Sequence, residues 1–279
     1  MGVWFLSAPA PLTPDFATGH QPDVGQGEKI FIAAGCASCH AAPDATEAQK
    51  QILAGGHAFA SDFGTFYAPN ISAGPNGIGA WTLPEFARAV TAGVSPTGQH
   101  YYPAFPYAAY QHMAETDVAD LFAYMQNLPV SDTPDKPHDV GFPFNIRRAL
   151  GLWKVLFVNK DFVLTQVQTP EIERGRYLVE GLAHCGECHT PRNILGGLDR
   201  GAWLSGAPNP SGKGRIPNIT PGALTWSEAD LIYYFESGLT PDYDSAGGSM
   251  TAVIDKLAQL PESDRAAIVA YLKAVPSLP

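Results

Sequence analysis

One five-residue pattern occurs twice in the chain and constrains its fold more than any other feature. The pattern is C-x-x-C-H, and its two copies, CASCH and CGECH, end at His40 and His189. Two cysteines three residues apart on a helical turn point to the same side of the helix. Each copy therefore predicts a site where two thiols and one imidazole come from a single turn. The two copies contain all four cysteines of the 279-residue chain, which are Cys36, Cys39, Cys185 and Cys188.

This pattern is the attachment signature of c-type haem. The two thiols can form thioether bonds to the vinyl-derived carbons on one edge of a porphyrin, and the adjacent histidine then supplies a proximal nitrogen to the iron. The other ring nitrogen of such a histidine usually donates to a backbone carbonyl group, which fixes the imidazole. The sequence thus predicts two covalently attached haem c groups, with His40 and His189 as iron ligands.

Three other uses of the cysteines fit the sequence less well. A structural zinc site needs the second C-x-x-C pair about 15 to 20 residues after the first, whereas Cys39 and Cys185 are 146 residues apart. A thioredoxin-like dithiol needs a βαβ context, but the residues before both pairs are typical of helices. Two disulfide bonds would leave both histidines without a role.

Similar segments follow the two motifs in the same order, at an offset of 145 to 149 residues. APNIS matches IPNIT, AWTLPEFARAVTAGVSP matches TWSEADLIYYFESGLTP, and ETDVADLFAYM matches ESDRAAIVAYL. We therefore expect an all-α fold of two tandem domains with long ordered loops, at residues 25–131 and 168–279. Each domain should contain a helix before the motif, a loop asparagine, a capped short helix and a closing helix. The matched positions are Asn70 and Asn218, Thr82 and Ser227, and Tyr124 and Tyr271.

Methionine is the usual sixth ligand of a haem that transfers electrons, and the chain has only four methionines. Met250 follows two glycines in a loop-like segment, which predicts that it is the sixth ligand of the second haem. Phe105 aligns with Met250 in the first half and cannot bind iron. Met113 is therefore predicted as the sixth ligand of the first haem, with His112, His100 or an open position as alternatives.

Arg192, in CHTPRN, is a candidate partner for a haem propionate, because a guanidinium group matches the geometry of a carboxylate. An ordinary surface role is the alternative for this residue.

Charge argues against binding to nucleic acid, and hydropathy argues against a segment that spans a bilayer. With 17 basic and 27 acidic residues, the net charge of −10 argues against nucleic acid, whose binding needs a basic face. No window approaches the roughly 20 apolar residues that span a bilayer.

Residues 1–24 are expected to form an N-terminal extension. It begins either as the remnant of a membrane anchor or as an ordinary chain terminus, and no complete export signal is expected. Residues 132–167 should form an ordered linker.

Three segments carry a resemblance to a known family: CHTPRNILGGLDRGAW, IPNITPGALTWSEADLIYYFESGLTPDYDSAGGSM and APNISAGPNGIGAWTLPEFARAVTAGVSPTGQHYYPAFPY. They resemble the dihaem and multihaem cytochrome c subunits of periplasmic alcohol, aldehyde and gluconate-type dehydrogenases. The resemblance implies cytochrome c domains and a periplasmic electron-transfer protein rather than an enzyme. Relatives often have methionine where this chain has Phe105.

The same resemblance implies a set of partners. Electrons would come from a periplasmic dehydrogenase subunit and pass to a quinone, a terminal oxidase or another cytochrome, with membrane anchoring at the N-terminus as an option. The alternative function is that of a dihaem redox enzyme, peroxidase-like or thiosulfate-oxidising, which would use an open or unusual haem site.

Overall fold

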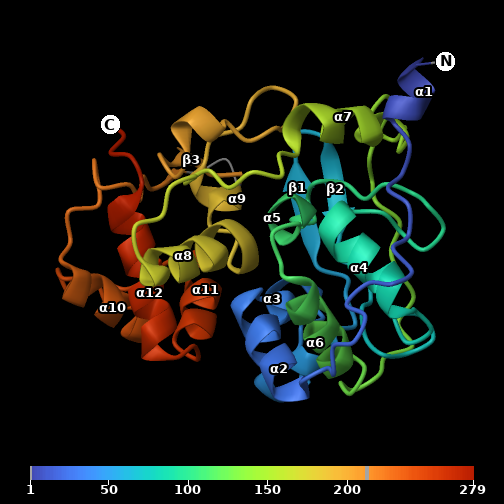
Figure 1. Cartoon of the computed structure of the whole chain (residues 1–279), viewed down its shortest axis with the longest axis horizontal. Helices are drawn as coiled ribbons and strands as arrows, with labels where there is room; N and C mark the ends of the chain where they lie inside the picture. Colours follow the sequence, from blue (N-terminus) through green and yellow to red (C-terminus); the bar gives the residue numbers. More distant parts are fainter. Residues whose placement is uncertain (1, 211–213) are drawn as a thin grey trace. The chain divides into compact units, whose positions relative to one another are not determined.

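The computed structural model describes residues 2–210 and 214–279, which are mainly helical (Figure 1). They divide into two compact units. The first unit comprises the chain up to Phe31 and residues Cys36–Val158, and the second comprises Ile32–Gly35 and Asn159–Pro279. Among the described residues, no helix has the length and apolar character that crossing a bilayer requires.

The helices and the one hairpin described before residue 158 belong to the first unit, apart from the last two residues of α2. Its elements are α1 (Gly2–Leu6), α2 (Val24–Ala33), α3 (Cys36–His40), the 3-10 helix η1 (Glu47–Ile52), β1 (Ala58–Ser61), β2 (Gly64–Tyr67), α4 (Leu83–Ala92), α5 (Tyr107–Tyr110), α6 (Glu115–Met125) and α7 (Ala149–Phe157).

The second unit repeats the order of the helices around the motif. Its elements are α8 (Pro170–Arg176), the π-helical turn η2 (Tyr177–Leu182), α9 (Gly186–His189), the 3-10 helix η3 (Arg200–Ala202), β3 (Ala207–Pro208), β4 (Arg215–Ile216), α10 (Glu228–Ser237), α11 (Ser249–Leu257) and α12 (Glu262–Ala274).

A glycine lets two helices cross closely in each unit. A Cβ atom on Gly27, in α2, would lie 2.0 Å from the carbonyl oxygen of Asp120 in α6. A Cβ atom on Gly175, in α8, would lie 1.9 Å from the carbonyl oxygen of Ala267 in α12. Only glycine permits either approach, so the helix before each motif packs directly against the backbone of the closing helix.

The two closing helices have apolar side chains at i, i+3, i+4 and i+7 spacings, which predicts one buried face in each. In α6, Val118, Leu121 and Met125 are at most 2% exposed. In α12, Ile268 and Tyr271 are likewise buried. Phe122, which the same 3.6-residue pattern of apolar side chains includes, is only half-buried, so the pattern is confirmed except at that position, and each helix closes over the core of its own unit.

Both expected capping boxes are present at the short helices α4 and α10. The hydroxyl oxygen of Thr82 accepts a hydrogen bond from the backbone N–H of Glu85, and the Glu85 carboxylate accepts one from the backbone N–H of Thr82. Ser227 and Asp230 make the same reciprocal pair in α10. The matched halves of the sequence therefore fold alike at these helices.

The all-α prediction omitted two short hairpins. Strand β1 pairs antiparallel with β2, and β3 pairs antiparallel with β4. Both hairpins are only two strands wide, and their strands are at most four residues long. Segments this short give almost no periodic signal in the sequence, so the fold is mainly rather than wholly helical.

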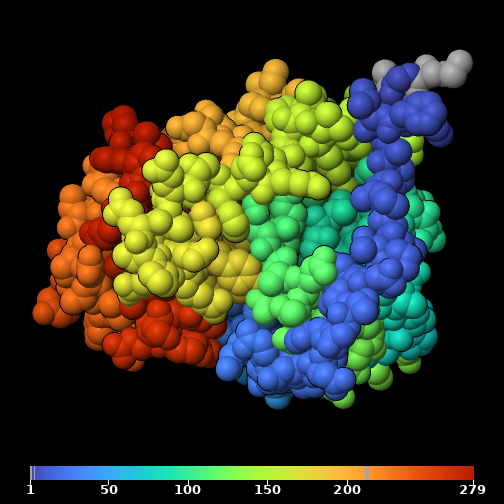
Figure 2. All heavy atoms as spheres, in the orientation of Figure 1, coloured from blue at the N-terminus to red at the C-terminus, as the bar shows by residue number. Residues whose placement is uncertain are grey.

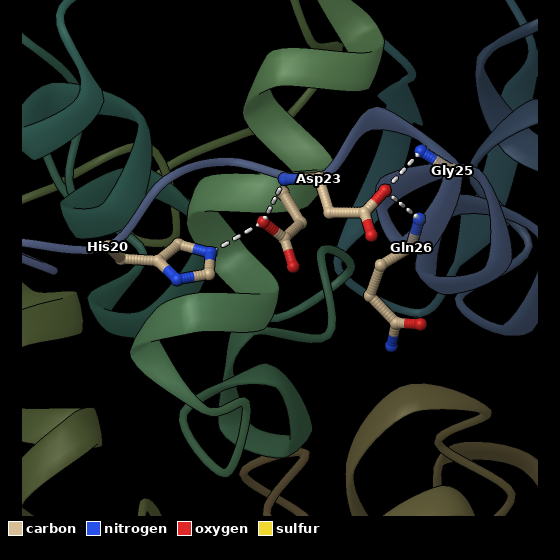
Figure 3. A network of polar contacts seen from close by, with 5 residues as sticks. His20, Asp23, Gly25 and Gln26 are labelled. Atoms are coloured by element: carbon tan, nitrogen blue, oxygen red, sulfur yellow. Dashed lines mark hydrogen bonds and ion pairs between the residues drawn. The ribbon is translucent and has the colours of Figure 1, made fainter.

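The N-terminal segment packs along the first unit, where it appears as a blue strip from α1 to α2 (Figure 2). A network of polar contacts holds the C-terminal end of this segment, just before α2 (Figure 3). The Nε2 atom of His20 lies 2.6 Å from Oδ1 of Asp120, which also accepts a hydrogen bond from the backbone N–H of Asp23. The Asp23 carboxylate in turn accepts from the N–H groups of Gly25 and Gln26 at the start of α2. The extension is thus tied to α6, near the crossing at residue 27.

Candidate haem-binding sites

The first C-x-x-C-H motif forms a single helical turn directly after α2. The chain leaves α2 through Gly35, whose φ of +64° lies in the left-handed region, and α3 begins at Cys36. The Nδ1 atom of His40 lies 2.9 Å from the carbonyl oxygen of Pro69. Because Nδ1–H donates to this carbonyl, Nε2 carries the lone pair that a metal ligand needs.

The second motif repeats this arrangement in the other unit. Its histidine lies at the end of α9, and the Nδ1 atom of His189 lies 2.8 Å from the carbonyl oxygen of Pro217. Burial lowers the pKa of both His40 and His189, although the hydrogen bond to the proline carbonyl opposes it. Both rings are therefore held in the neutral form, which is the form that binds iron.

The four cysteines of the two motifs are present as thiols. Among the described residues, none of the four cysteines is in a disulfide bond, and Cys39 and Cys188 are exposed. Burial, and then the neighbouring Cys188 thiol, raise the pKa of Cys185 to about 12. In each unit the two thiols and the one imidazole, whose Nδ1 atom already bonds to a carbonyl group, form a donor set that fits covalent haem, and the histidine would bind the iron.

An asparagine holds the proline carbonyl in place in the first unit. Asn70, which is 4% exposed, donates from Nδ2 to the carbonyl oxygens of Ser131 and Thr133, and its Oδ1 accepts from the backbone N–H of Ser72. These bonds fasten the loop after Pro69 to the segment that follows α6. Asn70 directly follows Pro69, so these bonds hold the carbonyl group to which His40 donates.

The second unit uses the same device. Asn218 donates from Nδ2 to the carbonyl oxygen of Leu278 at 3.0 Å, and its Oδ1 accepts from the backbone N–H of Thr220 at 2.8 Å. This bond fastens the loop after Pro217 to the segment that follows α12. The sequence predicted that both asparagines lie in loops, but it did not predict that they fasten those loops. The repeated Pro-Asn dipeptide, at residues 69–70 and 217–218, is the sequence signal that could have indicated it.

The two predicted methionine ligands lie in different settings. Met113 is 7% exposed in the turn between α5 and α6, as expected. Met250 was expected on a loop, but the structure places it at the second residue of α11, after Gly248 begins the helix with φ of +59°. Neither methionine is assigned to iron by these positions, and both remain predictions.

Two other predicted residues already have protein partners. His100, an alternative ligand, is buried, and its Nε2 atom lies 3.0 Å from the carbonyl oxygen of Ser7. Arg192 forms an ion pair with Glu187 and donates to the carbonyl oxygen of Gly196 at 2.8 Å. Since Glu187 lies between the two cysteines of the second motif, this ion pair places the Arg192 guanidinium beside that motif.

The structure also reveals a polar network that the sequence analysis missed. The Nε1–H group of Trp203 donates to the hydroxyl of Tyr271 at 2.9 Å, and that hydroxyl donates to the buried carboxylate of Glu180 at 2.8 Å. The six-membered ring of Trp203 covers Gly186, where an added Cβ would lie 2.0 Å from Cη2. The network therefore adjoins the second motif.

Comparison with known proteins agrees with this geometry. A model of the cytochrome c family matches residues 24–129. A diheme cytochrome c-type protein of Cereibacter sphaeroides is 53% identical over 278 residues, which cover 99% of this chain and 94% of that protein. The chain therefore belongs to the diheme c-type cytochromes, whose haem c is covalently bound.

Dehydrogenase subunits are also similar to this chain over most of its length. The fructose dehydrogenase cytochrome subunit of Gluconobacter japonicus is 40% identical over 96% of this chain and 55% of that protein. The gluconate 2-dehydrogenase cytochrome c subunit of Pantoea cypripedii is 35% identical over 90% of this chain and 59% of that protein. The chain thus spans little more than half the length of these two relatives.

Proposed function

We propose that the protein is a dihaem electron carrier that accepts single electrons from a periplasmic dehydrogenase subunit and passes them toward the respiratory chain. The acceptor would be a quinone, a terminal oxidase or another cytochrome. The observation that carries this proposal is the repetition of one site in both units, where His40 and His189 make the same hydrogen bond to a proline carbonyl.

The chain's own residues attach, orient and cap the two cofactors. Each haem, when bound, would supply a one-electron iron couple. Cys36 and Cys39 would hold one porphyrin through thioether bonds, and Cys185 and Cys188 would hold the other. The proximal histidines would bind iron through Nε2. The sixth ligands would be Met113 and Met250, and Arg192 would pair with a propionate of the second haem.

The domain organisation follows from the same duplication. We place one cytochrome c domain at residues 25–131 and a second at 168–279, with 132–167 as the connection between them. The paired helix crossings at Gly27 and Gly175 support this division, because each joins the helix before a motif to the closing helix of the same repeat.

The names of the relatives support a dehydrogenase as electron donor, since fructose and gluconate dehydrogenases both contain a cytochrome subunit similar to this chain. Attachment of haem c on the outer side of the cytoplasmic membrane supports a periplasmic location. The net charge of −10 favours partners with basic docking surfaces, and such association slows as salt screens the charges.

Removal of one motif at a time tests the two-site proposal. A variant with Cys36→Ala and Cys39→Ala should keep one covalent haem, and so should a variant with Cys185→Ala and Cys188→Ala. The unaltered protein should take up two electrons in separate one-electron steps, with both haems low-spin and unreactive toward carbon monoxide. A high-spin haem that turns over peroxide would contradict the carrier and favour the alternative dihaem enzyme.

A further inference from the structure

Unit 2 contains a buried carboxylate close to its C-x-x-C-H motif. Glu180 is 3% exposed and lies in the π-helical turn η2, five residues before Cys185. Its Oε1 atom accepts hydrogen bonds from the backbone N–H of Leu164 at 3.0 Å and from the hydroxyl of Tyr271 at 2.8 Å. Its Oε2 atom accepts from the backbone N–H of Val163.

The hydrogen-bond pattern indicates that this carboxylate is ionised. An ionised carboxylate only accepts hydrogen bonds, and every bond described for Glu180 has its partner as donor. Tyr271 has one hydroxyl proton and already accepts from Trp203, so that proton points to Glu180. Burial and the adjacent Glu180 carboxylate both raise the pKa of Tyr271, which keeps the phenol protonated as a donor.

In the described part of the chain, no cation forms an ion pair with Glu180. Arg176 lies one helical turn before it, but its guanidinium donates to the carbonyl oxygen of Leu164 and lies 3.6 Å from the carboxylate of Glu173. The ionised form of Glu180 is therefore stabilised by hydrogen bonds from two backbone N–H groups and one phenol rather than by an ion pair among the described residues.

Two contacts place this charge beside the second motif. The carbonyl oxygen of Val179, the residue before Glu180, accepts a hydrogen bond from the backbone N–H of Cys185 at 3.1 Å. The ring of Trp203 covers Gly186, which lies between the two cysteines.

Unit 1 has no equivalent buried charge at the matching place. Phe31 lies five residues before Cys36, as Glu180 does before Cys185, and its ring packs on Tyr124 with a centroid distance of 5.2 Å. Tyr124 matches Tyr271, and its hydroxyl lies near Glu28. Glu28 is exposed, so water screens its charge.

We propose that Glu180 is a potential-setting residue of the second haem site and lowers the reduction potential of the haem bound there. Reduction removes one positive charge from the iron, and a buried anion nearby stabilises the ferric state more than the ferrous state. The matching Phe31 gives the first site no such effect. This inference rests on the proposed function, because it assigns different potentials to two haems of one carrier.

The test is a spectroelectrochemical titration of the holoprotein with Glu180→Gln and Glu180→Asp. The Gln variant should shift one of the two midpoint potentials upward and leave the other unchanged, whereas the Asp variant should stay near the original value because it keeps the charge. Glu28→Gln is the matched control and should move neither potential. In the background of Cys36→Ala and Cys39→Ala, which retains only the second haem, the same upward shift should appear.

A second measurement compares the unaltered protein with Glu180→Gln by infrared spectroscopy. The difference spectrum between oxidised and reduced protein should contain the band of an ionised carboxylate that changes when the second haem is reduced and that is missing in Glu180→Gln, which separates it from the bands of the haem propionates. The inference is overturned if that band is missing from the unaltered protein. It is also overturned if both haems titrate but Glu180→Gln shifts neither midpoint potential, or if Glu180→Gln and Glu180→Asp shift the same midpoint potential equally. Failure to find two haems would instead overturn the proposed function.

Discussion

The imidazole of His189 donates from Nδ1 to the carbonyl oxygen of Pro217 across 2.8 Å, and this bond joins the end of α9 to a loop 28 residues later. His40 and Pro69 make the same bond in the first unit. In both cases the next residue, Asn218 or Asn70, fastens the loop to the segment after the closing helix. A chain of three hydrogen-bonded segments therefore fixes the direction in which each Nε2 atom points.

Replacement of Asn70 by alanine tests this chain of contacts. The change leaves the buried backbone N–H of Ser72 without its acceptor and removes the amide that donates to the carbonyl oxygens of Ser131 and Thr133. We expect the free energy of unfolding to fall by about 1–3 kcal/mol, measured by denaturant titration of the holoprotein. Asn127→Ala is the control, because its exposed side chain bonds only to the carbonyl oxygen of Ala123 one turn earlier, and it should cost much less.

Replacement of Met113 or Met250 by alanine tests the sixth ligands. Each change should abolish the sulfur-to-iron absorption band of one haem and lower its reduction potential, because methionine sulfur stabilises ferrous iron. Met125→Leu should leave both bands intact, since Met125 is a core residue, 2% exposed in α6. If the Met113 variant keeps both bands, the first haem takes another ligand.

Gly186 should not tolerate a side chain. Alanine there would bring its Cβ to 2.0 Å from the Trp203 ring, and we expect a loss of about 1–3 kcal/mol in stability, with less haem bound at the second motif. The first motif has Ala37 at the matching position, so the pattern itself does not demand glycine. Gly141→Ala is the control, because no atom lies within 4 Å of its Cβ position, and equal losses in the two variants would refute the explanation.

The capping box of α4 should make stability depend on pH. Hydrogen bonds from the backbone N–H and the hydroxyl of Thr82 lower the pKa of Glu85, so the ionised cap stabilises the fold above the ordinary glutamate pKa and this contribution is lost as pH falls through the lowered value. Thr82→Ala should cost about 1 kcal/mol at pH 7 and less in acid. Thr91→Ala, later in α4, removes a bond to the carbonyl oxygen of Ala87 and should show no such pH dependence.

The sequence predicted the parts of this molecule that depend on short-range spacing. The two helical turns of the motifs, the caps at Thr82 and Ser227 and the buried faces of the closing helices all repeat within a few residues. Such patterns can be read without knowing which distant segments meet. The duplication strengthened each prediction, because both halves had to satisfy it.

The missed features depend on partners far along the chain. Asn70 bonds to a carbonyl group 61 residues later, and Glu180 bonds to a tyrosine 91 residues later. The π-helical turn could have been predicted from the number of residues between each helix-crossing glycine and the first cysteine of its motif. Gly27 precedes Cys36 by nine residues, whereas Gly175 precedes Cys185 by ten. One extra residue between matched glycines and cysteines is what a π-helical turn accommodates.

The central claim is that both C-x-x-C-H motifs carry a covalent haem, and mass spectrometry of the purified, denatured protein tests it most directly. Thioether bonds survive denaturation, so the mass should exceed that of the polypeptide by two haem groups. Digestion should then give one haem on the peptide with Cys36 and Cys39 and one on the peptide with Cys185 and Cys188. A mass that exceeds the polypeptide by one haem or by none would contradict the account.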